Sequence, residues 1–128
     1  MNKTYYPLIL LPLLAFGAYY YLSPKCSQGD CKNGFGIESL PGRYRFEGEF
    51  KNGLAHGKGR LELANGEYYE GEWKNGIKEG RGLQRFSDGR YYEGFWKENK
   101  ENGKGILKNS DGGVLFEGEW KEGKAVAP

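Results

Sequence analysis

The chain has 128 residues, of which 38% are hydrophobic and 22 are glycines, and its formal net charge at pH 7 is +2. Frequent glycine disfavours a helical bundle, because each glycine inside a helix costs about 1 kcal/mol relative to alanine. The 10 tyrosines, 7 phenylalanines and 3 tryptophans can bury enough apolar area to disfavour plain disorder. A charge so close to neutrality provides no basic field for a nucleic-acid partner. We therefore expect a β protein, and no nucleic-acid binding.

An uncharged apolar run covers residues 5–22, after a short head that contains Lys3. In a helix, a run of this length rises about 27 Å, which just spans a thin hydrocarbon core. We expect residues 1–22 to form an N-terminal apolar helix that anchors the chain in a membrane with a single pass. A cleaved signal peptide, with its small-residue site over 15–17, is the alternative.

Two cysteines, Cys26 and Cys31, follow this segment and are separated by a Gly-Asp pair. A turn would bring the two thiols within disulfide distance, and an export-type segment favours an oxidising compartment. We predict a Cys26–Cys31 disulfide and a repeat domain on the extracytoplasmic side of the membrane, or secreted or periplasmic after cleavage. Two free cytosolic thiols are the alternative. A metal site would need more ligands, and we expect no cofactor.

From residue 23 onward the sequence repeats with a period of about 23 residues. An aromatic-Glu-Gly-x-aromatic block begins at positions 46, 69, 92 and 116. A Gly-basic-Gly triplet follows the first three blocks, and then an Asn-Gly or Asp-Gly pair, which favours a hairpin turn because these residues accept positive φ. We divide the chain into a degenerate capping unit with the cysteine pair over 23–45 and a repeat array over 46–128.

Strand alternation predicts two chemically different faces in each unit. In the unit that begins at residue 69, Tyr69, Gly71 and Trp73 share one face, and Glu70 and Glu72 share the other. The glycine leaves a gap between two large rings, so we expect successive units to stack into a continuous aromatic stripe. Cross-strand pairs of acidic and basic residues would line the opposite face, each contributing a few tenths of a kcal/mol.

The blocks Tyr69-Glu-Gly-Glu-Trp73-Lys-Asn-Gly76 and Gly80-Arg-Gly82 resemble MORN repeats (membrane occupation and recognition nexus). The resemblance extends over about residues 32–123. It implies an all-β fold, an elongated and curved single-layer antiparallel sheet of successive β-hairpins. It also implies a protein-interaction scaffold, a dimerisation element or a peripheral membrane element, often joined to a catalytic domain. We expect no such domain here, because only residues 124–128 follow the last match.

No pattern of side chains points to catalysis, and we expect no enzymatic activity. A catalytic nucleophile needs a base beside it, whereas the single histidine, His56, lies in a predicted turn. Paired carboxylates such as Glu70 and Glu72 recur along an exposed ladder and do not converge as a glycosidase requires.

Binding is the remaining class of function. We predict a membrane-tethered, non-catalytic scaffold that mediates protein–protein interaction at a membrane, with a homodimer as a further option. The candidate contacts with an unknown protein partner are Tyr69, Trp73, Tyr92, Phe95 and Trp96. Core packing is the alternative interpretation of the four residues other than Phe95. Phe95 stands where the repeat has glutamate, so it is either an exposed patch for a partner or a tolerated exception.

Two alternative functions stay open. Anionic lipid headgroups could contact Lys58, Arg81 and Lys104, which occupy equivalent positions of successive units, although the near-neutral charge weakens this hypothesis. Cell-wall or carbohydrate binding is the second, because choline-binding repeats are also short hairpins rich in glycine and aromatic residues. Their tryptophan typically follows glycine directly, whereas Trp73 and Trp120 follow glutamate.

Overall fold

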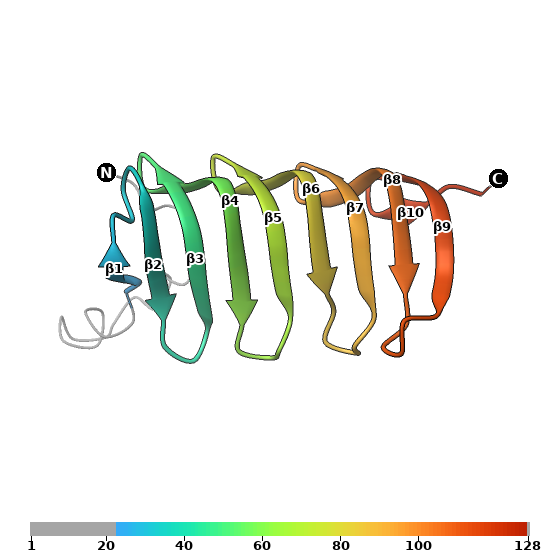
Figure 1. Cartoon of the computed structure of the whole chain (residues 1–128), viewed down its shortest axis with the longest axis horizontal. Coiled ribbons are helices and arrows are strands. Elements are labelled where there is room, and N and C mark those ends of the chain that lie inside the picture. The colour runs from blue at the N-terminus through green and yellow to red at the C-terminus, as the bar shows by residue number, and fades with distance from the viewer. Residues whose placement is uncertain (1–22, 128) are drawn as a thin grey trace, which may run out of the picture.

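The computed structural model describes residues 23–127, which form one antiparallel sheet of ten strands in chain order (Figure 1). The prediction of an elongated all-β sheet of successive hairpins is confirmed. The predicted apolar helix and membrane anchor over 1–22 lie outside the described residues, and no helix within 23–127 is long and apolar enough to cross a membrane. The strands are β1 (Lys25–Gly29), β2 (Phe35–Leu40), β3 (Tyr44–Lys51), β4 (Leu54–Leu63), β5 (Tyr68–Lys74), β6 (Ile77–Arg85), β7 (Tyr91–Lys97), β8 (Lys100–Lys108), β9 (Val114–Lys121) and β10 (Lys124–Ala125).

The hairpin turns follow from residues that accept positive φ. Between β3 and β4, Asn52 and Gly53 have φ angles of 52° and 78°, as a type I′ turn requires. Between β7 and β8, Glu98 and Asn99 have φ angles of 50° and 68°, although neither is a glycine. Asparagine tolerates this conformation, so Asn99 replaces the glycine of the other units and the hairpin still closes.

The strands are bent, and the bend gives the sheet an inner and an outer face. The register shifts between Gly71 and Trp73, where β6 carries extra residues opposite β5. Lys78 and Gln84 lie six positions apart on β6, a separation of about 20 Å in a straight strand. Their side chains nevertheless share a hydrogen bond from Lys78 Nζ to Gln84 Oε1. The strand therefore curves around the aromatic residues, and we call the aromatic side of the sheet the inner face.

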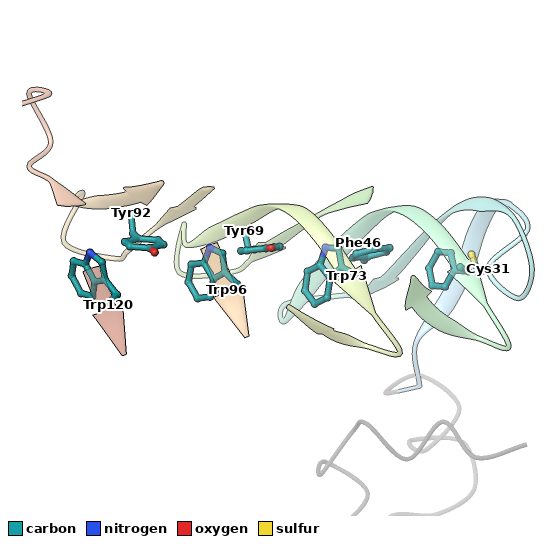
Figure 2. Packing of buried hydrophobic residues seen from close by; sticks show 8 residues of the cluster. Cys31, Phe46, Tyr69, Trp73, Tyr92, Trp96 and Trp120 are labelled. Carbon is teal, nitrogen blue, oxygen red and sulfur yellow. The ribbon is translucent and has the colours of Figure 1, made fainter. Parts of the chain in front are cut away.

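The aromatic residues of the inner face form one continuous edge-to-face stack (Figure 2). Trp96 is typical: its ring centroid lies 5.3 Å from that of Tyr92 in its own unit and 5.2 Å from that of Tyr69 in the preceding unit. Its indole Nε1 donates to the carbonyl oxygen of Gly82 at 3.2 Å. Each tryptophan thus joins two units, and such pairs stabilise a fold beyond the area they bury.

Glycine makes this stack possible, because a row of glycines crosses the sheet beneath the rings. A Cβ atom at Gly82 on β6 would overlap the ring of Tyr69 on β5, and one at Gly105 would overlap the ring of Tyr92. The rings therefore lie over the bare backbone of the neighbouring strand. Paired across the strands in this order, the row consists of Gly36, Gly48, Gly59, Gly71, Gly82, Gly94, Gly105 and Gly118.

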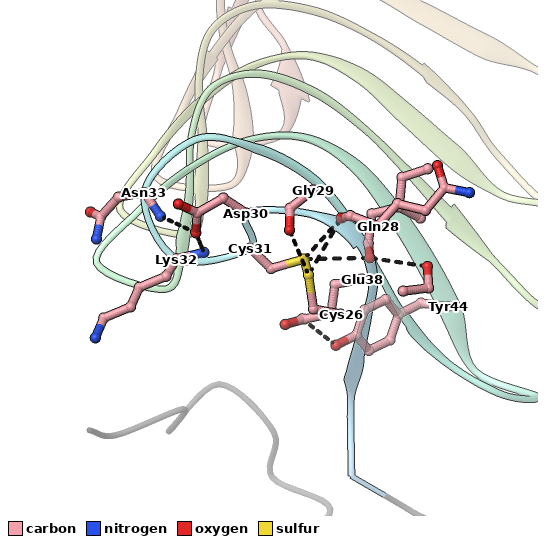
Figure 3. The surroundings of a disulfide bond; sticks show 11 residues. Cys26, Gln28, Gly29, Asp30, Cys31, Lys32, Asn33, Glu38 and Tyr44 are labelled. Carbon is pink, nitrogen blue, oxygen red and sulfur yellow. Dashed lines mark hydrogen bonds between the residues drawn. A yellow bond between two sulfur atoms is a disulfide. The ribbon is translucent and has the colours of Figure 1, made fainter.

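A disulfide closes the N-terminal end of the stack. Cys26 and Cys31 are bonded, with their Cα atoms 5.8 Å apart (Figure 3). Cys31 is 8% exposed and belongs to the same buried cluster as Phe46 and Phe50. The Asp30 carboxylate accepts hydrogen bonds from the backbone N–H groups of the two residues beyond Cys31, and these bonds lower the pKa of Asp30. The cysteine turn therefore acts as a cap over the first aromatic rings.

The double variant Cys26→Ser/Cys31→Ser is expected to lose about 2 kcal/mol of the free energy of unfolding, the chain entropy that a short covalent loop removes from the unfolded state. The measurement is the urea midpoint, read with and without reductant. Reductant should lower the midpoint of the wild type and leave that of the double variant unchanged. An equal midpoint for both proteins in the absence of reductant would show that the bond does not stabilise the cap.

Candidate functional site

Four of the five aromatic residues predicted to contact a partner are buried within the stack. The exposed fraction is 1% for Tyr69, 8% for Trp73, 0% for Tyr92 and 4% for Trp96, whereas Phe95 is 42% exposed. The four buried rings have no surface to offer a partner, so we assign them to core packing. The reason is the bend of the strands, which folds both arms of each hairpin around the rings.

The two buried tyrosine hydroxyls of the inner face donate hydrogen bonds within the fold. The Tyr92 hydroxyl donates to the Phe95 carbonyl oxygen at 3.0 Å, and burial raises the pKa of Tyr92 to about 12. Tyr69 makes the equivalent bond, and burial raises its pKa as well. The Lys78 ammonium lies 5.1 Å from the ring centroid of Tyr69 and 5.0 Å from that of Trp96, and burial lowers its pKa. Near neutral pH these phenols stay protonated and act as hydrogen-bond donors within the stack.

The outer face carries two rows of side chains, one on each side of the glycine row. Arg60 sits in the first row and pairs with Glu62 at 2.7 Å and with Glu70 at 2.9 Å. These hydrogen-bonded carboxylates, Glu62 foremost, raise the pKa of the Arg60 guanidinium. The first row is Ile37, Glu47, Arg60, Glu70, Leu83, Glu93, Ile106 and Glu117. The second row is Phe35, Glu49, Lys58, Glu72, Arg81, Phe95, Lys104 and Glu119.

Glutamates of the second row brace the bends of the strands, and Phe95 breaks this pattern. A Glu49 carboxylate oxygen accepts the backbone N–H of Lys58 at 2.6 Å. Glu72 accepts the backbone N–H of Arg81 in the same way. Phe95 takes the equivalent position in the third unit and puts a ring where the others have a carboxylate. The Arg81 guanidinium lies 5.5 Å from the centroid of that ring, within the range of a cation–π contact.

The three residues predicted to contact lipid are exposed on the outer face at equivalent positions. Lys58 pairs in register with Glu72, and Lys104 with Glu119. Only Arg81 has an uncharged residue, Phe95, directly opposite. Carboxylates facing two of the three cations reduce the attraction of this row for an anionic membrane.

Three shallow hollows follow one another along the outer face, with volumes of about 610, 530 and 410 Å³. Phe35 and Lys58 line both the first and the second hollow, and Arg81 lines both the second and the third. The glycine row forms part of the floor, and Phe95 lines the third hollow. The hollows therefore make one discontinuous groove from β2 to β9, which we call the outer groove.

Phe35 is a residue of this groove that the sequence analysis missed. It is 58% exposed and lies one period of 23 residues before Lys58. The 23-residue period therefore pointed to Phe35, but the unit around it is too degenerate for the substitution to stand out. The single histidine has a structural contact, since His56 Nδ1 accepts the backbone N–H of Asn75 at 3.3 Å. Within residues 23–127, no three His, Cys, Asp or Glu side chains are grouped to hold a metal ion.

A single sheet of stacked hairpins with a shared aromatic stack defines a β-repeat protein. The family model of the MORN repeat matches residues 46–68, 69–89, 92–114 and 116–126, and the chain belongs to this family. MORN repeats generally serve as modules for interaction with proteins or lipids. No curated protein matches the chain.

Proposed function

We propose that this chain is a membrane-tethered, non-catalytic scaffold that binds a protein partner through the outer groove. The observation that carries the proposal is the exposure of Phe95 at a position where the two preceding units place a bracing glutamate. A 42% exposed phenylalanine contributes nothing to the aromatic stack on the inner face. Exposed apolar groups that gather on a polar surface are typical of interaction sites.

The neighbours of Phe95 extend the apolar surface across three strands. Leu83 on β6 and Ile106 on β8 both pair in register with Glu93 on β7, two residues before Phe95 and on the same face. In the first two units Arg60 and Glu70 occupy this row and form an ion pair. Leu83, Phe95 and Ile106 thus form an apolar cluster over β6 to β8, which a partner would bury.

The membrane tether and the compartment rest on two features of the N-terminal part. The uncharged run over 5–22 is long enough for one membrane crossing. The Cys26–Cys31 disulfide is the kind of bond that persists in oxidising compartments. Both features support a repeat domain that is held at the extracytoplasmic surface.

Phe95→Glu restores the repeat pattern. We expect this variant to lose binding of the partner without losing stability. We expect a gain of up to about 1 kcal/mol in stability if the new carboxylate accepts the Lys104 N–H, as a hydrogen bond to a charged group can provide. The test is in-cell cross-linking with full-length bait, with bait that lacks residues 1–22, and with the Phe95→Glu bait. If the chain is a membrane-tethered scaffold, the wild-type bait should capture a protein that neither of the two altered baits captures.

Val114→Glu is the matched control, because Val114 is 57% exposed on β9 and the substitution adds the same charge. This variant should keep the captured protein. Equal capture by wild type and Phe95→Glu would refute the role of Phe95. Recovery of lipid or cell-wall material alone would favour one of the two alternative functions.

A further inference from the structure

The geometry points to a specific kind of partner, an extended peptide segment that runs along the outer groove across the strands. We infer that it places one apolar side chain against Phe35 and a second against Phe95, with acidic residues between them that face Lys58 and Arg81. This inference rests on the proposed function and names the chemistry of its partner.

Two exceptions to the repeat pattern carry the inference, and both put an exposed phenylalanine in the second row. Phe35 occupies the position that is basic in the later units, as in Lys58 and Arg81. Phe95 occupies the position that is acidic in the earlier units, as in Glu72. Their exposed fractions are 58% and 42%. Every other member of the second row is charged, so these two rings are its only apolar anchors.

The two rings lie on one line along the sheet. Each is one residue away from the glycine row and on the same side of it, because Phe35 pairs with Glu49 beside Gly48, and Phe95 follows Gly94. Five strand-to-strand steps separate β2 from β7. At about 4.8 Å a step the rings are about 24 Å apart, the length of about seven residues of extended peptide.

The outer groove connects the two rings. Phe35 lines the first and second hollows, and Phe95 lines the third. Between the rings the floor includes the backbone of Gly59 and Gly71, and the first and second rows lie on either side of it. A bound segment therefore has a continuous path between the two rows from one ring to the other.

Between the two rings the second row holds two carboxylates and two cations, and within residues 23–127 the cations have no ion pair. Among residues 23–127, no carboxylate lies within ion-pair distance of the Lys58 ammonium or the Arg81 guanidinium. The nearest glutamates, Glu49 and Glu72, already accept backbone N–H groups. Arg60, by contrast, is fully engaged with its own two carboxylates. Lys58 and Arg81 are therefore the cations available to a carboxylate of the partner.

The test is selection of a random peptide display library on the full-length chain, followed by affinity measurements with the selected peptides. We expect peptides with two large apolar residues about six or eight positions apart, because side chains on one face of an extended peptide are separated by an even number of positions. At least one acidic residue should lie between them. Phe35→Lys and Phe95→Glu, which restore the repeat pattern, should each weaken binding about tenfold. Val114→Glu should leave binding unchanged, and circular dichroism should show the same β signal for all variants.

The outcomes separate this inference from the proposed function. Two results together support the inference. The selected peptides should lose affinity for both phenylalanine variants, and they should also lose affinity when the spacing between their apolar residues is shortened by three residues. Peptides that depend on Phe95 alone overturn the two-anchor inference and leave the scaffold intact. Basic peptides, or peptides insensitive to both variants, also overturn it. Failure of the selection together with failure of the cross-linking experiment would refute both proposals.

Discussion

Gly82→Ala is expected to lower the free energy of unfolding by about 3 kcal/mol, the upper part of the range for overpacked cores. The added Cβ would overlap the ring and the hydroxyl oxygen of Tyr69. That ring cannot move freely, because it packs edge-to-face on Trp73 at 5.0 Å and on Trp96 at 5.2 Å. One methyl group must therefore displace a ring that joins two units. The measurement is the midpoint of urea denaturation, monitored by circular dichroism.

Gly34→Ala provides the matched control, because a Cβ there would meet only the Asp30 side chain, at 3.3 Å and beyond. We expect a change within about 0.5 kcal/mol for this variant. In the double variant Tyr69→Ala/Gly82→Ala the alanine has no ring to displace. The loss of free energy of unfolding in the double variant should therefore be smaller than the sum of the losses in the two single variants, by at least about 1 kcal/mol. A wild-type midpoint for Gly82→Ala would refute the assignment of the glycine row as the seat of the rings.

Much of this architecture could be predicted from the sequence, because it depends on local rules repeated in phase. The 23-residue period and the Asn-Gly and Asp-Gly pairs set the hairpins, and the alternation around Gly71 assigned Tyr69 and Trp73 to one face. These rules need only neighbours along one strand. The structure follows them through β9, including the type I′ turn at Asn52.

The burial of the rings could not be predicted in this way. A single-layer sheet normally leaves both faces in contact with water, so an aromatic stripe on one face looks like a binding surface. Its burial depends on the bend opposite Glu72, where β6 carries extra residues, and on the fit of Tyr69 over Gly82 of the adjacent strand. Both are relations between strands. The sequence correctly indicated that the rings need glycine beside them. The glycine beneath each ring, however, lies on the next strand, as Gly82 lies beneath Tyr69.

The candidate site lies where the sequence departs from its own repeat. Positions that build the stack are aromatic in all four MORN units, so their residues report on folding. Phe35 and Phe95 replace charged residues in the outer row without entering the stack. The fold does not require either ring, and their exposure has a hydrophobic cost. That combination makes binding the better explanation for both residues.

Trp96→Ala is expected to destabilise the chain by about 4 kcal/mol, as for other large aromatic residues truncated in a core. Trp96 is 4% exposed and is the ring that links Tyr69 of one unit to Tyr92 of the next. Repeat proteins are stabilised mainly by contacts between adjacent units. A cavity in the middle of the stack should therefore uncouple its two halves, as well as weaken the whole.

Urea denaturation followed by hydrogen exchange in each half measures this uncoupling. We expect a single transition for wild type and two partly separated transitions for Trp96→Ala. Trp120→Ala serves as the control, because Trp120 stacks on Tyr92 and Phe116 near the C-terminal end, so its loss should leave the preceding units cooperative. Trp96→Phe keeps a ring in the stack but loses the hydrogen bond to Gly82, so it should cost only about 1–2 kcal/mol. One sharp transition for Trp96→Ala near the wild-type midpoint would mean that the aromatic stack does not couple the units, and the backbone ladder would then be the source of cooperativity.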